Sequence, residues 1–331
     1  MGDNVSNFFV ADFCRIVFAV GARIWYNINM QEFKKIVVLG STNTDMVIRG
    51  KYLPAPGETI CGGVFAMNPG GKGANQAVAV ARLAAKKGAC VFIAKVGDDL
   101  FGRDTIARMA KEGIDGRLIV DKKEPSGTAL ILVDKKGQNV ISVALGANGT
   151  LSKKDITPLK KEIEGAAVLL LQLETPIETV GAAAEIAHKA GVAVILNPAP
   201  AAKLPRKVYG CLDWITPNET EAELLTGVKV VDVGSAKAAA AVLKGRGVKN
   251  VLITMGAKGC YVDEIGKVVS AKKVKAVDCV AAGDTFNGAF AVALAEGRGT
   301  VEAVEFAQKA SAISVTREGA QPSIPRRKEI R

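Results

Sequence analysis

The sequence predicts an α/β protein with a doubly wound, mostly parallel central sheet, helices on both faces, and a small β-sheet lid. From Lys34 onward, short β-branched runs alternate with alanine-rich stretches of helical length. The apolar runs are continuous, which is typical of strands that are buried on both faces of a parallel sheet. Two further segments break this alternation and predict the lid.

The elements follow in order along the chain. Strands are predicted within 34–40, 90–97, 166–174, 192–198, 212–218 and 250–256. Helices are predicted at 73–88, 102–113, 177–191 and 235–247. Pro217-Asn218 is consistent with another helix start, and the apolar run after Asp284 is predicted as helix.

Residues 46–67 and 127–145 contain strand-like pieces separated by turn residues. Both segments are predicted as antiparallel strands inserted between units of the parallel sheet. Such a lid would project over the carboxyl edge of the sheet, where ligands bind in open α/β folds. Because no repeat or low-complexity linker interrupts the rest, residues 34–331 are predicted as one domain that carries the lid.

The first 33 residues differ from the remainder and are predicted as an atypical extension. This segment is apolar, but Asp12, Arg15 and Arg23 make it a poor membrane span. It also lacks the basic region that precedes the apolar part of a secretory signal. Since orderly strand patterning begins just after Met30, we expect the first 29 residues to be dispensable.

Composition excludes several classes of function. The net charge is +11, but the lysines are scattered in pairs and aromatic residues make up only 5%. A basic surface of this kind suits anionic substrates better than nucleic acid, and neither a nucleic-acid nor a membrane partner is expected. The six cysteines form no C-x-x-C pair, which favours reduced thiols in a cytoplasmic protein. With His188 as the only histidine, His-rich zinc sites are excluded and a Ser-His-Asp triad is disfavoured.

The segment "NPGGKGANQA" places three glycines and Lys72 directly before a predicted helix. Its spacing fits neither the P-loop nor the dinucleotide G-x-G-x-x-G pattern. The interpretation that remains is a glycine turn that lets the backbone approach a ligand, with Lys72 and Asn75 as polar contacts. An ordinary loop is the alternative.

Polar side chains follow several predicted strands. Asn43 and Asp45 come after the first strand, and Glu174 closes the strand in 166–174. Asn218 and Glu221 follow a later strand. An Asn and an Asp two residues apart can bind vicinal hydroxyls of a sugar, while an Asx turn is the alternative. The joint placement of these residues at one sheet edge predicts a ligand site there.

The stretch "AVDCVAAGDTFNGAF" leads through Ala281, Ala282 and Gly283 to Asp284 and then into a helix. Asp is among the preferred residues at helix starts, so Asp284 could serve only as a cap. The alternative is that backbone N–H groups at a positive helix end bind phosphate.

Beyond these local patterns, residues 34–325 resemble the ribokinase-like family of carbohydrate and nucleoside kinases. The motifs that carry the resemblance are "GSTNTD", "PGETI", "NPGGKGANQA", "VGDDLFG", "LQLETP", "NPAPA", "TPNETEAELLTG", "AAGDTFNGAF" and "SVTREGAQPSIP". "GGKGANQA", the N-x-D pair and the "GAQPS" tail are more particular to the members that phosphorylate ribose.

The resemblance implies ATP-dependent phosphorylation of D-ribose at O5, which gives ribose 5-phosphate and ADP. Asp284 would be the general base, and the N–H groups of Ala281, Ala282, Gly283 and Asp284 would form an anion hole for the transferred phosphoryl group. The residues that would hold the sugar are Asn43, Asp45, Gly71, Lys72, Gly73, Asn75, Glu174 and Asp284.

The resemblance also implies a nucleotide site, two kinds of cation and a homodimer formed through the lid. ATP would contact Asn218, Thr254, Gly256, Ala257, Gly259, Gly283 and Gln308, and Glu221 would be linked to Mg²⁺. A monovalent cation, K⁺, would bind at Asp278, Val280, Ser314, Arg317, Gly319 and Ser323. The family commonly has two threonines where this chain has Cys279 and Val280, so any role for those hydroxyls is lost.

Three rival functions stay open at this point. Another sugar or nucleoside kinase of the same family, acting on deoxyribose, fructose or adenosine, shares the "AAGD" block. A sugar-binding protein without catalysis would not need Asp284. A nicotinamide enzyme is disfavoured, because the dinucleotide fingerprint is missing.

Overall fold

The computed structural model describes residues 34–330. The extension predicted for residues 1–33, including Cys14, lies outside the described residues. Among residues 34–330, no helix is long and apolar enough to cross a membrane.

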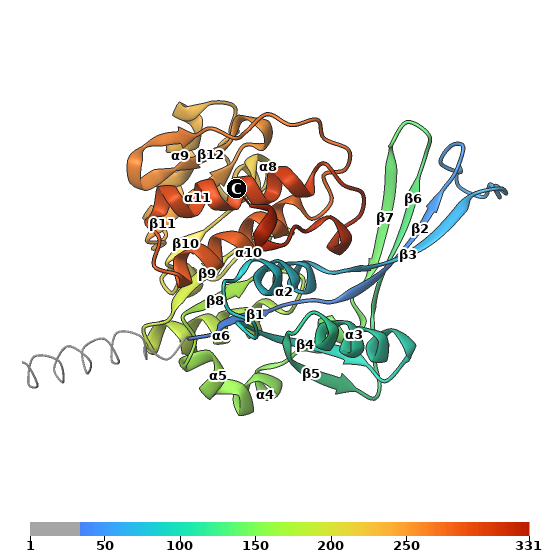
Figure 1. Cartoon of the computed structure of the whole chain (residues 1–331), viewed down its shortest axis with the longest axis horizontal. Coiled ribbons are helices and arrows are strands. Elements are labelled where there is room, and N and C mark those ends of the chain that lie inside the picture. Colours follow the sequence, from blue (N-terminus) through green and yellow to red (C-terminus); the bar gives the residue numbers. More distant parts are fainter. Residues whose placement is uncertain (1–33, 331) are drawn as a thin grey trace, which may run out of the picture. The chain divides into compact units, whose positions relative to one another are not determined.

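The core of the fold is a nine-stranded sheet with the order β13-β12-β11-β10-β9-β8-β1-β4-β5 (Figure 1). Its strands are β1 (Ile36–Leu39), β4 (Cys90–Gly97), β5 (Asp115–Asp121), β8 (Val168–Leu171), β9 (Ala193–Leu196), β10 (Trp214–Ile215), β11 (Asn250–Thr254), β12 (Cys260–Val262) and β13 (Lys267–Val269). The strands from β5 to β11 pair in parallel, while β12 and β13 form an antiparallel edge. The doubly wound, mostly parallel prediction is confirmed.

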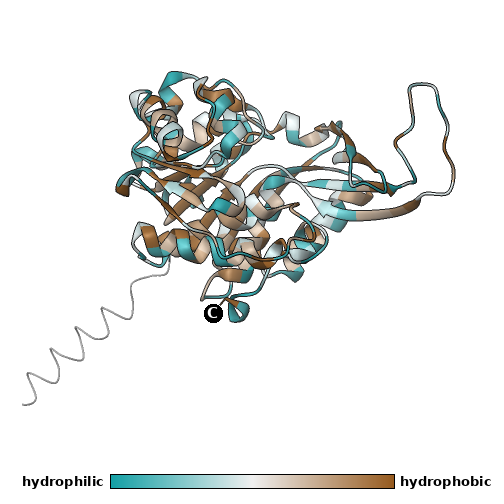
Figure 2. Cartoon of the chain, turned by 90° about the horizontal axis from the view of Figure 1, so that it is seen from above, coloured by the Kyte–Doolittle hydropathy of each residue, from teal (hydrophilic) through white to brown (hydrophobic). Residues whose placement is uncertain are grey.

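The two central strands β1 and β8 are hydrophobic and buried at every position because both faces of the sheet are covered (Figure 2). Side chains alternate between two cores, as the strand period of two requires. Val37 and Leu39 of β1 belong to one core, and Ile36 and Val38 belong to the other.

Helices pack on both faces. One core receives side chains from α5 (Lys160–Glu164), α6 (Ile177–Lys189), α8 (Glu219–Thr226) and α9 (Val233–Gly245). The other receives them from α2 (Lys72–Leu83), α3 (Leu100–Lys111), α10 (Ala282–Ala295) and α11 (Thr300–Ser314). Two short helices, α4 (Lys153–Ile156) and α7 (Arg206–Tyr209), complete the set within residues 34–330.

The lid is a separate four-stranded sheet of β3-β2-β6-β7, which projects from the main body (Figure 1). Its strands are β2 (Asn43–Arg49), β3 (Val64–Gly70), β6 (Gly127–Val133) and β7 (Asn139–Ala144). The expectation of purely antiparallel strands was wrong, because β2 and β6 pair in parallel. β2 and β3 form one antiparallel hairpin, and β6 and β7 form a second. The first strands of the two hairpins, β2 and β6, run in the same direction and pair with each other.

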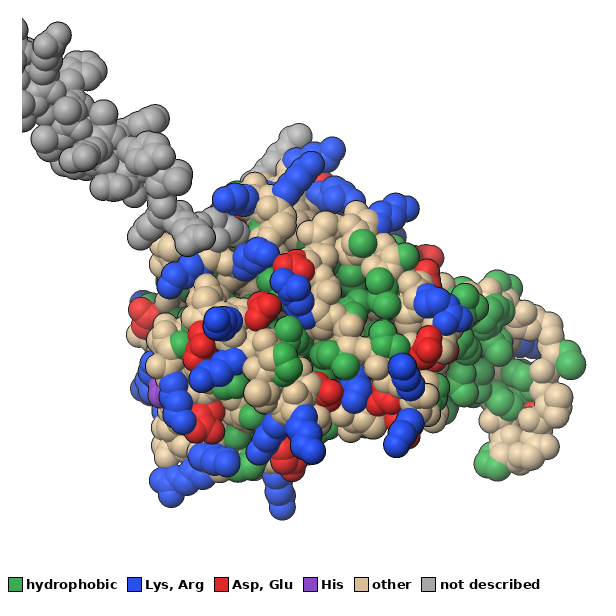
Figure 3. Space-filling model, turned by 90° about the horizontal axis from the view of Figure 1, so that it is seen from below, with side chains coloured by type: hydrophobic (Ala, Val, Ile, Leu, Met, Phe, Trp, Pro, Cys, Tyr) green, Lys and Arg blue, Asp and Glu red, His purple; other side chains and the backbone are tan. Residues whose placement is uncertain are grey.

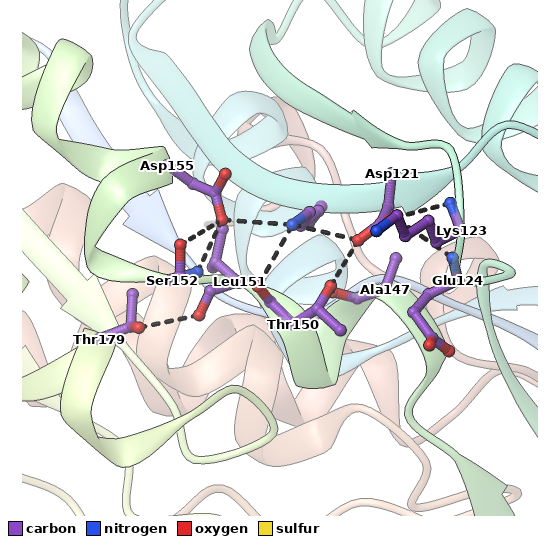
Figure 4. Close-up of polar contacts among 10 residues, drawn as sticks. Asp121, Lys123, Glu124, Ala147, Thr150, Leu151, Ser152, Asp155 and Thr179 are labelled. Carbon is purple, nitrogen blue, oxygen red and sulfur yellow. Dashed lines mark hydrogen bonds and ion pairs between the residues drawn. The ribbon is translucent and has the colours of Figure 1, made fainter.

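Polar contacts fix the lid to the main sheet where its second hairpin departs and returns (Figure 4). Asp121, at the end of β5, accepts hydrogen bonds from the N–H groups of Lys123 and Glu124 and from Thr150 Oγ1 at 2.8 Å. Lys95 Nζ of β4 lies 3.1 Å from Asp121 Oδ2 and 3.3 Å from Asp155 Oδ2. The segments on either side of the hairpin are thereby tied to one strand of the central sheet.

The strand order reverses direction between β1 and β8, which makes these two neighbouring strands the switch point of the sheet. From β1 the chain proceeds through β4 to β5 on one side, and from β8 it proceeds through β9 to β11 on the other. The carboxyl ends of the two strands that flank such a point form the usual ligand crevice of this fold.

Helices α2 and α10 cross at close range beside this switch point. A Cβ atom on Gly288 of α10 would lie 2.5 Å from Ala79 Cβ and 2.9 Å from Gln76 O of α2. Only a glycine lets the two helices approach this closely, so Gly288 fixes how their first turns face each other.

Replacing Gly288 with alanine is expected to lower the free energy of unfolding by about 1–3 kcal/mol, because the added methyl group forces α2 and α10 apart. Urea unfolding followed by circular dichroism measures this change. Gly245→Ala is the matched control, since a Cβ there meets no atom within 4 Å. It should be neutral or stabilising by up to ~1 kcal/mol. Equal destabilisation by both substitutions would contradict the close crossing.

Candidate active site

The glycine turn before α2 passes directly against the segment that follows β1. Gly71 has a φ of 87°, and a Cβ there would lie 2.7 Å from Asn43 N. A Cβ on Gly73 would lie 2.6 Å from the backbone of Gly40 and Ser41. The glycines of "GGKG" allow a close approach of backbone, and the partner at this distance is the protein's own "GSTNTD" segment. The approach of a ligand to this turn stays a prediction.

Glu174 holds this turn in place. Its Oε2 atom accepts hydrogen bonds from Ser41 Oγ at 2.5 Å and from the backbone N–H of Lys72 at 3.0 Å. A carboxylate at the start of α2 is favoured by the positive end of the helix. The Oε1 atom of Glu174 has no hydrogen-bond partner among the described residues, which leaves one carboxylate oxygen for a ligand.

Asp284 lies in the first turn of α10 with only 7% of its surface exposed. Asn75 Nδ2 donates to its Oδ2 atom at 2.9 Å, and Gln76 Nε2 donates to its Oδ1 atom at 3.0 Å. Burial raises the pKa of Asp284, while the Lys72 charge and the two amide hydrogen bonds oppose that rise. The side chain does not cap its own helix, because the residue at the N-cap is Ala281 and no side chain bonds there.

The backbone at the start of α10 leaves N–H groups without acceptors among the described residues. Ala281 adopts a left-handed conformation with a φ of 59°, the only positive φ at a non-glycine residue within residues 34–330. The N–H of Ala282 donates to Cys279 O at 3.2 Å, whereas those of Gly283 and Asp284 have no acceptor among the described residues. A Cβ on Gly283 would meet nothing within 4 Å, so a phosphoryl group can approach these N–H groups.

Lys72 is surrounded by carboxylates. Burial alone would lower the pKa of Lys72, but the charges of Asp284, Glu174, Glu221 and Asp45 raise it above its ordinary value. Lys72 therefore carries a positive charge at neutral pH. Asp45, which lies on β2, has a pKa raised to about 6 by burial and by the charges of Glu174 and Asp284.

Two amides beside these charges have distinct hydrogen-bonding states. Asn43 Oδ1 accepts from Asn148 Nδ2 at 2.8 Å, and Asn148 also bonds both backbone groups of Thr42. The Asn75 Oδ1 atom is buried without any hydrogen-bond partner among the described residues. A buried acceptor next to a carboxylate is suited to a ligand hydroxyl, since leaving it unpaired costs about 1–3 kcal/mol.

Farther along the same sheet edge, Asn218 and Glu221 begin α8 and bond to each other. Asn218 Oδ1 accepts from Glu221 N at 2.8 Å, and Glu221 Oε2 accepts from Asn218 N at 2.9 Å. The helix start predicted at this position is confirmed. Burial raises the pKa of Glu221, the Asn218 backbone hydrogen bond and the charge of Lys72 lower it, and the charge of Asp284 raises it.

The other residues predicted to contact nucleotide adjoin this helix start. The N–H of Thr254, at the end of β11, donates to Pro217 O at 3.0 Å. The turn that contains Gly256 and Ala257 follows, and a Cβ on Gly259 would lie 2.1 Å from Val269 O. Gln308 Nε2 of α11 donates to that same carbonyl at 2.7 Å. The chain therefore brings these residues into one continuous region.

The residues predicted to hold a monovalent cation also come together. Asp278 accepts hydrogen bonds from Val280 N and Gly319 N, both at 3.0 Å. The Val277 N–H donates to Val315 O, between Ser314 and Arg317. Ser323 Oγ donates to Ala320 O at 2.7 Å, and Arg317 is paired with Glu329. Within residues 34–330, no group of three or more His, Cys, Asp or Glu side chains could hold a metal ion.

Sequence reasoning missed the buried polar residues that are connected to Asp284 through hydrogen bonds. These are Gln76, Gln172, Asn197, Thr216 and Asn287, which form a chain of buried side-chain hydrogen bonds. A usable signal was the single amide in the apolar run "VLLLQLE", because a buried amide needs partners. His188 is exposed near the end of α6, as expected, and the five described cysteines are free thiols.

A buried carboxylate beside backbone N–H groups that lack acceptors, at the switch point of a doubly wound sheet, is typical of an α/β protein whose ligand site lies at the carboxyl edge of the sheet. The chain belongs to the pfkB family of carbohydrate kinases, whose sequence model matches residues 34–327. It is 48% identical to the ribokinase of Haemophilus influenzae over 299 residues, covering 89% of this chain and 97% of that protein.

The chain is also similar to a deoxyribokinase and to a ribokinase of known structure. The deoxyribokinase of Salmonella typhimurium is 39% identical over 296 residues, covering 88% of this chain and 95% of that protein. The solved structure of Arabidopsis thaliana ribokinase complexed with ribose and ATP has a TM-score of 0.81 and 33% identity, covering 90% of this chain and 97% of that chain.

The charge of Asp45 is expected to cost stability. Because its pKa in the folded state is about 6 and the ordinary value is 3.8, the folded state is destabilised as pH rises through this interval. Asp45→Asn should be more stable than the wild type by about 1–2 kcal/mol at pH 7.5, after allowance for its partial exposure. The difference should fall below ~0.5 kcal/mol at pH 4, where Asp45 is protonated in the folded state and is losing its charge in the unfolded state.

Urea unfolding at the two pH values measures this difference. Asp98→Asn, at a surface position with a side chain 61% exposed, is the control and should change stability by less than ~0.5 kcal/mol at both. A destabilised Asp45→Asn protein at pH 7.5 would contradict the electrostatic account.

Proposed function

We propose that this protein transfers the γ-phosphoryl group of ATP to the O5 hydroxyl of D-ribose, giving D-ribose 5-phosphate and ADP. The observation that carries the proposal is the arrangement at the start of α10. There, Asp284 is buried between two amide donors and adjoins the free N–H groups of Gly283 and Asp284 itself. A proton acceptor and an anion site thus lie within one helical turn of each other.

The sugar would bind on the lid side of Asp284. Its contacts would come from the side chains of Asn43, Asp45, Lys72, Asn75 and Glu174 and from the backbone of Gly71 and Gly73. The unpaired Asn75 Oδ1 atom and the free Glu174 Oε1 atom support this assignment, since both are acceptors suited to sugar hydroxyls. The hydroxyl groups of a neutral sugar would donate hydrogen bonds to these acceptors, which otherwise have no partner, and would add no further charge to the site.

In the reaction, Asp284 accepts the proton of the O5 hydroxyl as the oxygen attacks the γ-phosphorus. The bond between the γ-phosphorus and the bridging oxygen breaks, and ADP leaves with its electron pair. Negative charge on the phosphoryl oxygens would be stabilised by the N–H groups of Ala281 to Asp284 and by the positive end of α10. Because the Ala282 N–H is bonded to Cys279, the groups of Ala281, Gly283 and Asp284 are the free donors.

ATP would extend from α10 along the sheet edge formed by Asn218, Thr254 and the turn of Gly256, Ala257 and Gly259, with Gln308 nearby. The open space beside Gly283 supports this placement. Mg²⁺ usually binds through one or two carboxylates and substrate phosphates, and when bound it neutralises phosphate charge. Glu221 is a carboxylate on the nucleotide side whose Oε1 atom has no partner among the described residues, so it fits that use.

A K⁺ ion is proposed at the loop of Asp278 and Val280 with Ser314, Arg317, Gly319 and Ser323. The hydrogen bond from Gly319 N to Asp278 joins the two loops three residues before the left-handed residue Ala281. A cation there would favour the conformation of the anion site. With Cys279 and Val280 in place of hydroxyl residues, the Val280 contact would come from its backbone carbonyl.

Deoxyribose, fructose and adenosine are the alternative acceptors. The similarity to a deoxyribokinase favours deoxyribose among these, since the two pentoses differ by one hydroxyl group. The cytoplasmic location expected from the cysteines stays a prediction.

Asp284→Asn is expected to lower kcat by about 10²–10⁴-fold, because the amide cannot accept the hydroxyl proton. The assay is ADP release with Mg²⁺-ATP in the presence of ribose, deoxyribose, fructose, adenosine or no sugar. Phosphorus NMR of the product identifies the phosphorylated hydroxyl.

Replacement of Na⁺ by K⁺ in the same assay should raise the rate. Asp98→Asn is the control for a surface carboxylate outside the site and should keep the wild-type rate. Full activity in Asp284→Asn would contradict the mechanism, and a preference for another sugar would retain the mechanism but reject ribose.

We also propose a homodimer that forms through the lid. The strand register places Met46, Ile48, Phe65, Met67, Leu130, Leu132 and Val140 on one face of the lid sheet, opposite to the face of Asp45. We call this surface the lid face. Phe65 is 59% exposed and Leu130 is 56% exposed. Figure 3 shows hydrophobic side chains gathered on the lid. An exposed apolar patch of this kind favours association with a second copy.

The double substitution Phe65→Lys with Met67→Lys is expected to give a monomer at concentrations where the wild type is a dimer. Sedimentation velocity measures the difference. The matched control is Ile141→Lys, which adds one lysine on the opposite face of the lid and should leave the dimer intact. A monomeric wild type at tens of micromolar would contradict the proposal.

A further inference from the structure

A chain of buried amides lies behind Asp284. Gln76 Nε2 donates to Asp284 Oδ1 at 3.0 Å and to Asn197 Oδ1 at 3.1 Å. Gln172 Nε2 in turn donates to Gln76 Oε1 at 2.6 Å. Gln76 and Gln172 both have 0% exposure. These contacts join α2, the segments after β8 and β9, and the start of α10.

The contacts fix the direction in which the Gln76 amide points. Because Gln172 donates to its oxygen, the NH₂ group of Gln76 must face the other way, toward Asp284. Asn197 accepts the second proton and donates its own NH₂ group to Thr216 O at 3.3 Å. Rotating the Gln76 amide would leave several buried groups without partners, which is costly in an interior of low dielectric constant.

Asn75 and Gln76 act on different oxygens of the same carboxylate. Asn75 donates to Oδ2, and its own Oδ1 atom is unpaired on the side assigned to the sugar. Gln76 donates to Oδ1 and is fully buried, so it cannot contact the sugar. Any effect of Gln76 on the reaction must therefore pass through Asp284.

We propose that Gln76, oriented by Gln172 and Asn197, is a positioning residue that holds Asp284 Oδ1 and so presents Oδ2 to the acceptor hydroxyl. This inference rests on the proposed function, in which Asp284 is the general base. The same hydrogen bond favours the ionised carboxylate, because an amide donor stabilises negative charge.

The groups that face Asp284 determine the direction of the pH effect. They are Lys72 of α2, Asp45 of β2, Glu174 after β8 and Glu221 of α8. Burial raises the pKa of Asp284, and the Gln76 hydrogen bond is among the contacts that lower it. Removing this donor should raise the pKa further. Since the base must be ionised, the acidic limb of the rate profile should move to higher pH.

Gln76→Met tests this role, because the methionine side chain keeps the length of glutamine without its amide. The plot of kcat against pH should shift its acidic limb upward by about one unit, and kcat at the plateau should fall about tenfold. The KM for ribose should change less than threefold, because Gln76 does not touch the sugar. Titration of ¹³Cγ-labelled aspartate by NMR, with the Asp284 signal assigned from Asp284→Asn, should show the same shift in the full chain.

Two further variants make the result decisive. Gln172→Met removes only the group that orients Gln76 and should shift the limb in the same direction by a smaller amount. It also serves as the test if Gln76→Met fails to fold. Thr179→Val removes another buried hydrogen bond, from Thr179 Oγ1 to Leu151 O at 2.8 Å and remote from Asp284, and should leave the pH profile unchanged.

The outcomes separate the two proposals. A wild type that phosphorylates none of the sugars contradicts the proposed function. An active wild type with unshifted profiles and NMR titrations in Gln76→Met and Gln172→Met contradicts the positioning role alone. A shift of the same size in Thr179→Val would also overturn it, because the effect would then reflect only lost stability.

Discussion

The close crossing of α2 and α10 at Gly288 is the contact on which the candidate site depends. The two helices begin more than 200 residues apart in sequence, yet Asn75 and Gln76 of one bond the carboxylate of Asp284 in the other. Each helix start has its own task. The first turn of α2 carries Lys72 and the amides, and the first turn of α10 carries the carboxylate and the free N–H groups. A larger residue at position 288 would separate these two sets of groups.

The site also concentrates charge at a cost to stability. Lys72 is surrounded by the carboxylates of Asp45, Glu174, Glu221 and Asp284, and burial raises the pKa of Asp45, Glu221 and Asp284. A fold selected only for stability would not gather them. The amide donors at Asp284 offset part of this cost by favouring its ionised form. In the proposed reaction, the same contacts would keep the carboxylate ready to accept a proton.

Much of the fold followed from local sequence, because strands buried on both faces are apolar at nearly every position. The six predicted strands of the central sheet were found, whereas β5, β12 and β13 were missed. β5 and β13 are the two edge strands of the sheet, and β12 and β13 are only three residues long. The parallel pairing of β2 with β6 could not be predicted, because it joins two hairpins that are distant in sequence and have no local signal for register.

The site was predictable where polar residues follow strands or glycine turns, as at Asn43, Glu174 and Asp284. Its supporting residues were not, because Gln76 lies on the same helix as many buried apolar residues and its direction depends on Gln172, 96 residues away. Asn43 and Asp45 were expected at the end of a central strand, and they instead begin the lid strand β2. Movement of the lid would therefore move two of the proposed sugar contacts.

The most direct measurement is a crystal structure of the protein with ribose and a non-hydrolysable ATP analogue. We expect Asp284 Oδ2 to lie about 2.6–3.2 Å from the O5 hydroxyl, a hydrogen-bonding distance for a general base. The γ-phosphoryl group should contact the N–H groups of Gly283 and Asp284, with the Gln76 hydrogen bond to Oδ1 intact. A sugar hydroxyl that instead faces another carboxylate, with Asp284 out of contact with it, would contradict the central claim that this buried side chain is the base.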